Sequence, residues 1–210
     1  MGLREQRKLR TRRTLMEVAL RLFEERGYEA TTVAEISAAA EVSPATFFNY
    51  FPSKEEVIFA DRPVQSELPG RLLGERRPGE TPAQALRRAL HEALDLPWWT
   101  VDPEARDLVL ARVRVIASVP ALRARALLEV ADLQQRWSTE LVAVFEGRLD
   151  DFEADVLTGA AIGAILAVTG RALRDAAPDR SLAELVRQAV TAALDAPPGG
   201  ARNPATRGAE

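Results

Sequence analysis

Apolar residues recur at helical spacing along almost the whole chain of 210 residues. The first run has the i, i+3, i+4, i+7, i+8 spacing of one buried helix face. Its members are Leu15, Val18, Ala19, Leu22 and Phe23. Gly27 follows this run as a C-terminal stop signal. We find no convincing strand alternation and no internal repeat, so the pattern predicts an all-α fold.

Two short helices are predicted next, and each has a capping signal at its start. Thr32, followed by Glu35 three residues later, has the spacing of a capping box. Ser43 can cap the second of these helices, and Pro44 takes its first helical position, where a missing N–H has no cost. Only two residues separate the short helices. A longer helix followed by this pair predicts a helix-turn-helix unit.

A larger helical region follows this unit. Ser53 and Glu56 repeat the capping box and open a fourth helix. Proline and glycine accumulate between Arg62 and Pro82, which predicts a linker or mobile stretch. Helical spacing resumes over about 83–96, 103–118, 120–145, 151–174 and 182–194. We therefore expect a helix-turn-helix domain over residues 1–60 with a basic arm at 1–13, a larger helical domain over 61–196, and a disordered tail over 197–210.

Composition restricts the chemistry. The chain has no cysteine and one histidine, so we expect no disulfide, metal site or cofactor. Its N-terminus is charged, and the charge-free run over residues 156–170 is shorter than a membrane span of about 20 residues. A cytoplasmic protein without membrane association is expected. The net charge is −3, yet the opening segment is basic, with only Glu5 opposing Arg4, Arg7, Lys8, Arg10, Arg12 and Arg13. Such an arm can follow an anionic polymer or surface, or remain solvated.

Four of the twelve aromatic residues fall within five positions, at Phe47, Phe48, Tyr50 and Phe51. Phe47 and Phe51 are four apart and share one helix face, so we expect them to form the core pair. A different face is then presented outward, and it contains Pro44, Ala45, Phe48 and Asn49. A helix of this size fits the DNA major groove, where Phe48 can contact a thymine methyl group and Asn49 an adenine edge or a phosphate.

The helix starts near this face are candidate phosphate contacts. Thr32, Ser43 and Ser53 each stand where free N–H groups and the helix dipole favour an anion, although such residues can also act only as caps. The side chains of Thr46, Tyr50 and Lys54 add donors. Residues 1–60 carry nine Lys or Arg and nine Glu, so DNA binding requires most of the glutamates to face away from the duplex. These are Glu17, Glu24, Glu25, Glu29 and Glu35.

The segment from about Thr14 to Ala60 closely resembles the tetracycline-repressor (TetR) family of bacterial transcriptional regulators. The resemblance is carried by LFEERGY at 22–28, ATTVAEI at 30–36 and VSPATFFNYFPSKEE at 42–56. It implies base-facing roles for Pro44, Ala45, Phe48 and Asn49, and phosphate contacts for Thr32, Ser43, Thr46, Tyr50 and Lys54. Glu41 departs from the family, which commonly has glycine in this turn. We expect the turn to form and the carboxylate to reduce operator affinity.

For the larger half, the resemblance implies a helical ligand-binding and dimerisation domain. The segment 157–167 is apolar around much of its circumference, and its small residues permit close helix approach. The final helix has a clear apolar stripe, so an isologous four-helix contact is expected, with burial inside the monomer as the alternative. The candidate dimer residues are Gly159, Ile162, Gly163, Leu166, Leu185, Val186 and Ala189.

Four residues are candidates for the effector site. The candidate ligand residues are Trp98, Trp99, Arg112 and Trp137. Core packing is the alternative for Trp137, which lies on a helix stripe, and a surface ion pair is the alternative for Arg112. Unbroken aliphatic surface favours a small apolar effector, and an arginine would suit an acidic one. His91 lies off its helix's apolar face and is expected to be solvated.

Three readings of function remain. The first is a TetR-like regulator, a repressor that binds a palindromic operator as a homodimer and is released by a small molecule. The second is a DNA-binding dimer without an effector, whose larger half only dimerises or holds a protein partner. The third, an enzyme, rests on Asp150, Asp151 and Asp155, whose spacing departs from the magnesium motifs of helical terpenoid synthases. Capping of a helix start explains that run fully, so we expect no catalysis.

Overall fold

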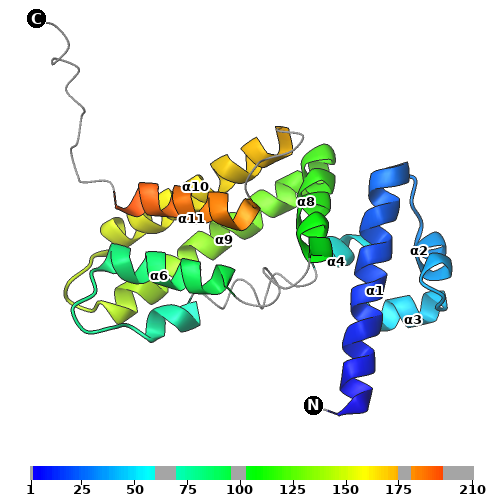
Figure 1. Ribbon diagram of the computed structural model, residues 1–210, viewed down its shortest axis with the longest axis horizontal. Coiled ribbons are helices and arrows are strands. Elements are labelled where there is room, and N and C mark those ends of the chain that lie inside the picture. Colours follow the sequence, from blue (N-terminus) through cyan, green and yellow to red (C-terminus); the bar gives the residue numbers. More distant parts are fainter. Residues whose placement is uncertain (1, 60–69, 96–102, 175–180, 196–210) are drawn as a thin grey trace, which may run out of the picture.

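The computed structural model describes residues 2–59, 70–95, 103–174 and 181–195. Figure 1 shows two groups of helices, with α1, α2 and α3 at one end and α6, α9, α10 and α11 at the other. Two further helices, α4 and α8, lie where the groups meet. The described residues are helices and their connections, so the predicted all-α class is confirmed.

The first group is the predicted helix-turn-helix arrangement. It consists of α1 (Leu3–Arg26), α2 (Val33–Ala39) and α3 (Pro44–Tyr50). Gly27 ends α1 with a φ of 87°, a backbone conformation that glycine adopts without strain. The Thr32–Glu35 capping box opens α2, and Ser43 caps α3 ahead of Pro44. Residues 3–13 of the predicted basic arm form the first part of α1.

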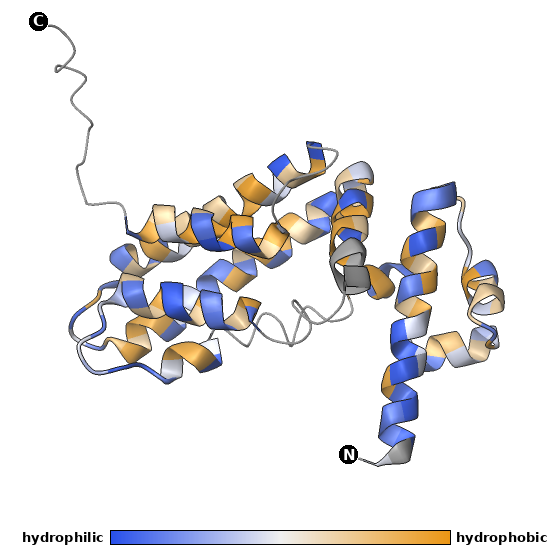
Figure 2. Cartoon of the chain, viewed as in Figure 1, coloured by the Kyte–Doolittle hydropathy of each residue, from blue (hydrophilic) through white to orange (hydrophobic). Residues whose placement is uncertain are grey.

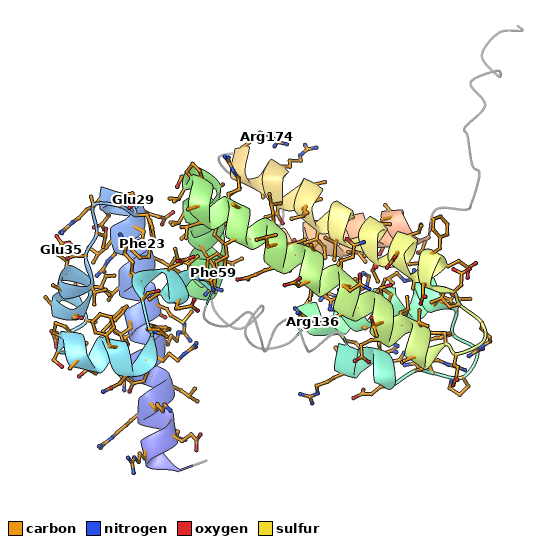
Figure 3. All side chains as sticks on the ribbon, turned by 180° about the vertical axis from the view of Figure 1, so that it is seen from behind. Phe23, Glu29, Glu35, Phe59, Arg136 and Arg174 are labelled. Atoms are coloured by element: carbon orange, nitrogen blue, oxygen red, sulfur yellow. The ribbon has the colours of Figure 1, made fainter. Side chains whose placement is uncertain are left out.

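The core of this first group extends into the second. One buried cluster joins residues of α1, α2, α3 and α4 (Lys54–Phe59) to Ala111 and Val115 of α8 (Pro103–Ser118) and Leu122 of α9 (Pro120–Val144). Figure 3 shows Phe59 of α4 at this junction. The first group of helices therefore shares buried side chains with α8 and with the start of α9.

The second group has its own core. It contains α6 (Pro82–Leu94), α10 (Asp151–Arg174), α11 (Leu182–Leu194), most of α9 and the short helical stretch 70–74. Local signals fix the helix starts, since capping boxes at Thr81 and Ser181 open α6 and α11. The backbone N–H of Glu153 donates to Asp150 at 2.7 Å at the start of α10. The acidic run there is thus a helix cap, and the described residues hold no cluster that could ligate a metal.

The prediction that His91 is solvated is wrong. Its ring is half-buried between α6 and α11, where Nε2 lies 3.3 Å from the Arg187 carbonyl oxygen and 3.4 Å from Thr191 Oγ1. The Arg187 guanidinium donates in return to the His91 carbonyl oxygen at 3.2 Å. Burial lowers the pKa of His91, and the hydrogen bond to the Arg187 carbonyl opposes that shift only in part. The residue therefore belongs to the contact between two helices.

Helix α10 is long and apolar enough, by length and composition, to cross a membrane, although only 22% of its most apolar window is buried inside the chain. A single such helix is weak evidence for a span. It begins at an acidic cap, carries Asp151, Glu153 and Asp155 in its first turns, and packs against α9 and α11. One side of α10 is core, and the other is an apolar surface without a neighbour among the described residues.

Two predicted features lie outside the described residues. They are the tail over 197–210 and the first part of the Pro- and Gly-rich stretch, residues 62–69. The division of the chain at residue 60 stays a prediction.

Candidate nucleic-acid interface

Helix α3 separates its aromatic residues as expected. The side chains of Phe47 and Phe51 are 0% and 1% exposed, whereas Phe48 is 54% exposed. The Phe47 ring packs against Phe51 at 5.7 Å between centroids and meets the Phe48 ring edge-on at 5.5 Å. Two buried rings thus hold α3 in place while a third projects outward. The outer face, which we call the α3 ridge, consists of the exposed residues Pro44, Ala45, Phe48 and Asn49.

The turn before α3 depends on one unusual backbone conformation. Glu41 has a φ of 56°, in the left-handed region that residues with a Cβ adopt at a cost of about 1–2 kcal/mol. The turn closes when the backbone N–H of Val42 donates to the Ser37 carbonyl at 2.9 Å. This conformation explains why glycine suits the position. The predicted turn forms with glutamate, and its carboxylate is exposed beside the ridge.

The candidate phosphate contacts are already engaged in the cap network. The Thr32 hydroxyl is 2.9 Å from a Glu35 carboxylate oxygen and accepts from the Glu35 backbone N–H at 3.2 Å. The Thr32 backbone N–H also donates to this carboxylate at 2.9 Å, and that hydrogen bond, together with the one from the Thr32 hydroxyl, lowers the pKa of Glu35. Ser43 Oγ accepts from the Thr46 backbone N–H at 3.0 Å and lies 2.9 Å from Thr46 Oγ1. Thr32 and Ser43 remain exposed, whereas Thr46 and Tyr50 are half-buried.

Lys54 occupies a different environment from the one expected of a phosphate contact. Its ammonium donates to the backbone carbonyls of Tyr28 at 2.8 Å and Thr31 at 3.2 Å, and it lies 4.3 Å from the centre of the Tyr28 ring. Burial raises the pKa of Tyr28 to about 12, and the nearby Glu55 carboxylate adds to the shift. Lys54 thus ties α4 to the loop between α1 and α2. Sequence reasoning missed this role because the carbonyls lie more than twenty residues earlier in the chain.

Several glutamates are occupied by contacts inside the protein. Glu24 pairs with Arg114 of α8 at 2.7 Å, which turns its carboxylate toward the junction between the two groups of helices. Glu17 pairs with Arg13 at 2.6 Å. Figure 3 shows Glu29 and Glu35 at the edge of the first group, near the α1–α2 connection. Glu35 pairs with Arg26 at 3.2 Å, so its charge is partly neutralised close to the α2 start.

Comparisons with known proteins agree with this geometry. A family model described as bacterial regulatory proteins of the tetR family matches residues 15–60, and one described as the MftR C-terminal domain matches residues 80–197. The HTH-type transcriptional regulator TcmR of Streptomyces glaucescens is 37% identical over 155 residues, covering 71% of this chain and 67% of that protein. The chain belongs to the TetR family of transcriptional regulators.

Other relatives extend the comparison. The HTH-type transcriptional repressor DhaR of Mycobacterium sp. strain GP1 is 28% identical over 170 residues, covering 80% of this chain and 73% of that protein. The crystal structure of a TetR-family regulator from Mesorhizobium loti superposes with a TM-score of 0.58 over 90% of this chain and 96% of that chain, at 21% identity. The TetR fold thus accounts for an N-terminal DNA-binding helix-turn-helix and a helical C-terminal domain.

The structure describes two of the four candidate effector residues of this TetR-family chain, Trp137 and Arg112. Trp137 is buried in the C-terminal core, beside Leu141 and Phe145 on the same helix stripe. Arg112 is half-buried on α8. Trp98 and Trp99 lie outside the described residues.

The candidate dimer residues separate into inner and outer positions. Ile162 of α10 and Val186 of α11 are buried in the chain's own core, so they are not available for a dimer contact. The sequence did not reveal this for Ile162, because α10 is apolar on two sides and its pattern alone does not show which side faces inward. Gly159 faces α9, where an added Cβ would lie 3.2 Å from Gln134 Nε2. Leu185 and Ala189 are half-buried. Only Gly163 and Leu166 are exposed.

Arg125 forms a junction between domains that sequence reasoning missed. From α9 its guanidinium pairs with Glu55 at 2.9 Å and Glu56 at 2.7 Å on α4, and with Glu129 at 3.0 Å. It also stacks over the Phe59 ring, 4.2 Å from the centroid. Partial burial lowers the pKa of Arg125, but the three carboxylates outweigh it and raise the pKa overall. No local signal marks this contact, since about seventy residues separate its partners.

Proposed function

We propose that this chain is a one-component repressor that binds a near-palindromic operator as a homodimer and is released by a small molecule. The α3 ridge carries the proposal, because a large apolar side chain and an amide are presented outward from a helix anchored by two buried phenylalanines. Similarity to DhaR, a protein named as a repressor, supports repression over activation. In a TetR dimer the two α3 helices enter successive major grooves about 34–36 Å apart.

Within the operator, the roles divide by chemistry. Phe48 contacts a thymine methyl group, and Asn49 binds an adenine edge or a phosphate. The small exposed residues Pro44 and Ala45 let the groove wall approach closely. The family resemblance implies phosphate contacts for Thr32, Ser43, Thr46, Tyr50 and Lys54. Lys54 also fixes the loop before α2, since its ammonium donates to that loop's carbonyls.

Dimerisation uses the outer side of α10. Phe152, Val156, Gly163 and Leu166 follow the spacing i, i+4, i+11, i+14, which places them within one narrow face. The three large side chains are 75%, 53% and 46% exposed, and no described residue approaches within 4 Å of a Cβ added at Gly163. A second copy of α10 and α11 would bury this strip in a four-helix contact.

Sedimentation velocity tests the dimer directly. Leu166→Glu places a carboxylate in the proposed contact and is expected to give monomer at micromolar concentration. Leu128→Glu is the matched control, because Leu128 is 70% exposed but lies on α9. A dimer that survives Leu166→Glu and dissociates with Leu128→Glu would move the interface to α9.

The effector acts through the long helix α9. This helix carries Arg125 at the α4 contact and Trp137 in the C-terminal core, about 18 Å apart at 1.5 Å per residue. A small apolar or acidic ligand that shifts the C-terminal core therefore moves α4 and changes the separation of the two α3 helices. Coupling of this kind is typically about 1–3 kcal/mol. A regulator of this class works in the cytoplasm, where its DNA is, and its relatives are regulators rather than enzymes.

Selection of bound duplexes from a random DNA pool tests the proposal. The expected product is an inverted repeat whose half-site centres lie about one helical turn apart. Recovery of unrelated sequences would refute the repressor function. A ligand screen on the selected site follows, with operator release and thermal stabilisation as readouts. If no small molecule changes either, the chain is a DNA-binding dimer without an effector.

A further inference from the structure

The inner face of α1 changes from apolar to basic along its length. In the second half of the helix this face carries Leu15, Ala19 and Leu22, all buried. At 100° per residue, Arg4, Arg7 and Lys8 lie within about 80° of the same direction. Arg10 lies about 140° away, on the opposite side. The face that packs on the helix-turn-helix core therefore continues past that core as a row of cations.

Along α1, the contact of Arg12 with Phe51 marks where the helix-turn-helix core ends. The Arg12 guanidinium lies 5.1 Å from the centroid of Phe51, the residue that closes α3. Residues nearer the N-terminus extend beyond α3, as Figure 1 shows, and Figure 2 shows this end of α1 as mostly hydrophilic. Arg4, Arg7 and Lys8 are exposed, and even Leu9 is 51% exposed.

Few acidic residues oppose the cations at this end of α1. Glu5 is the only acidic residue among the first sixteen, and no ion pair joins Arg4, Arg7 or Lys8 to a carboxylate within the described part of the chain. The positive end of the α1 dipole adds to their field. Because α1 is one continuous helix from Leu3 to Arg26, its packing against α2 and α4 and the contact of Arg12 with Phe51 fix where the cations lie. A duplex held by α3 would be the nearest dense array of negative charge.

We propose that Arg4, Arg7 and Lys8 form a second DNA contact, which binds backbone phosphates beside the half-site that α3 reads. This inference rests on the proposed operator binding and adds to it a contact that is independent of base sequence. Its consequence is that the protein needs duplex beyond the bases it recognises. In a dimer, three such contacts per subunit make six per operator.

The test compares two variants on two duplexes. Arg4→Gln/Arg7→Gln/Lys8→Gln removes the proposed contact, and Arg10→Gln removes a charge of the same segment from the opposite face. Each is titrated with salt on the selected site alone and on that site with one helical turn of flanking duplex at each end. Counterion release contributes a slope of about 0.9 per phosphate, so six contacts predict a loss of about 5 from the salt slope on the long duplex.

On the long duplex we expect the triple variant to bind at least tenfold more weakly at 0.1 M salt, with an unchanged preference for the selected site over random DNA. On the short duplex it should bind like the wild type, and Arg10→Gln should change the slope by less than 1 per subunit. Equal slopes for the triple variant and the wild type on the long duplex would overturn the proposal. Binding to vesicles of phosphatidylglycerol that is lost in the triple variant, with an unchanged DNA slope, would assign the face to a lipid surface.

The two proposals fail differently. A wild-type protein that selects no sequence refutes operator binding itself. If the protein selects an inverted repeat but the triple variant has the same salt slope as the wild type, only the second contact is refuted.

Discussion

Replacing Arg125 with methionine removes the charge that joins the two domains and keeps most of the side chain's length. The change deletes ion pairs with Glu55 and Glu56 on α4, the ion pair with Glu129 within α9, and the cation stacked on Phe59. A partly exposed ion pair contributes about 0.2–1 kcal/mol, and a cation over an aromatic ring about 0.5–1 kcal/mol or somewhat more. The sum predicts that Arg125→Met lowers the free energy of unfolding by about 1–3 kcal/mol.

Urea denaturation at low and high salt measures this loss. Arg123→Met is the matched control, since Arg123 is an exposed arginine on the same helix and its removal should cost less than about 0.5 kcal/mol. The difference in unfolding free energy between Arg125→Met and Arg123→Met should become smaller at 1 M salt, where the Debye length is about 3 Å. The part of this difference that comes from stacking on Phe59 should persist.

A double-mutant cycle with Glu56→Gln isolates the contact to α4. We expect a coupling energy of about 0.5–1 kcal/mol, together with a change in the concentration of ligand that releases the operator once a ligand is known. If Arg125→Met is no more destabilising than Arg123→Met, or the cycle shows no coupling, the reasoning that this arginine links α9 to α4 is refuted.

Three further predictions concern single positions. Glu41→Gly should raise the free energy of unfolding by up to about 1 kcal/mol, because relief of the left-handed backbone outweighs the added freedom of the unfolded chain; a lower midpoint in urea would contradict this. The pKa of His91 is lower in the folded chain than in the unfolded chain, so on acidification the unfolded chain takes up the proton first and the free energy of unfolding should fall below about pH 6.5. His91→Gln should flatten this fall in a pH series of unfolding curves. The resonance of the single histidine, followed by NMR, should titrate with a midpoint below 6.5. Phe47→Ala should cost about 3–5 kcal/mol in thermal or urea unfolding, as expected for a fully buried ring, and a loss below 1 kcal/mol would show that α3 is anchored in another way.

Local sequence signals determined most of the helix boundaries. Capping residues act within three positions of the helix they open, so Thr32 and Ser43 could be identified from the sequence alone. The division of α3 into buried and exposed rings follows from its 3.6-residue period, because Phe47 and Phe51 share a face that Phe48 does not.

Interactions between distant segments were not predictable in the same way. His91 appeared solvated because its neighbours on α11 lie about a hundred residues later. The contacts of Lys54 with backbone carbonyls could not be predicted, because those carbonyls belong to an earlier loop. The apolar circumference of α10 indicated that something packs on it, but only the fold shows that Ile162 faces inward and Leu166 outward. Periodicity gives the direction of a side chain relative to its own helix and not the identity of what it meets.

The most direct test of the account is the ratio of affinities for the selected site and for random duplex, measured for the wild type and for Phe48→Ala. Phe48 is more than half exposed, so Phe48→Ala should unfold at the same temperature as the wild type. We predict that in Phe48→Ala the difference in binding free energy between the selected site and random duplex falls by about 1–3 kcal/mol per half-site, while binding to random duplex is retained. An unchanged ratio in a folded Phe48→Ala protein would show that the exposed face of α3 does not read DNA.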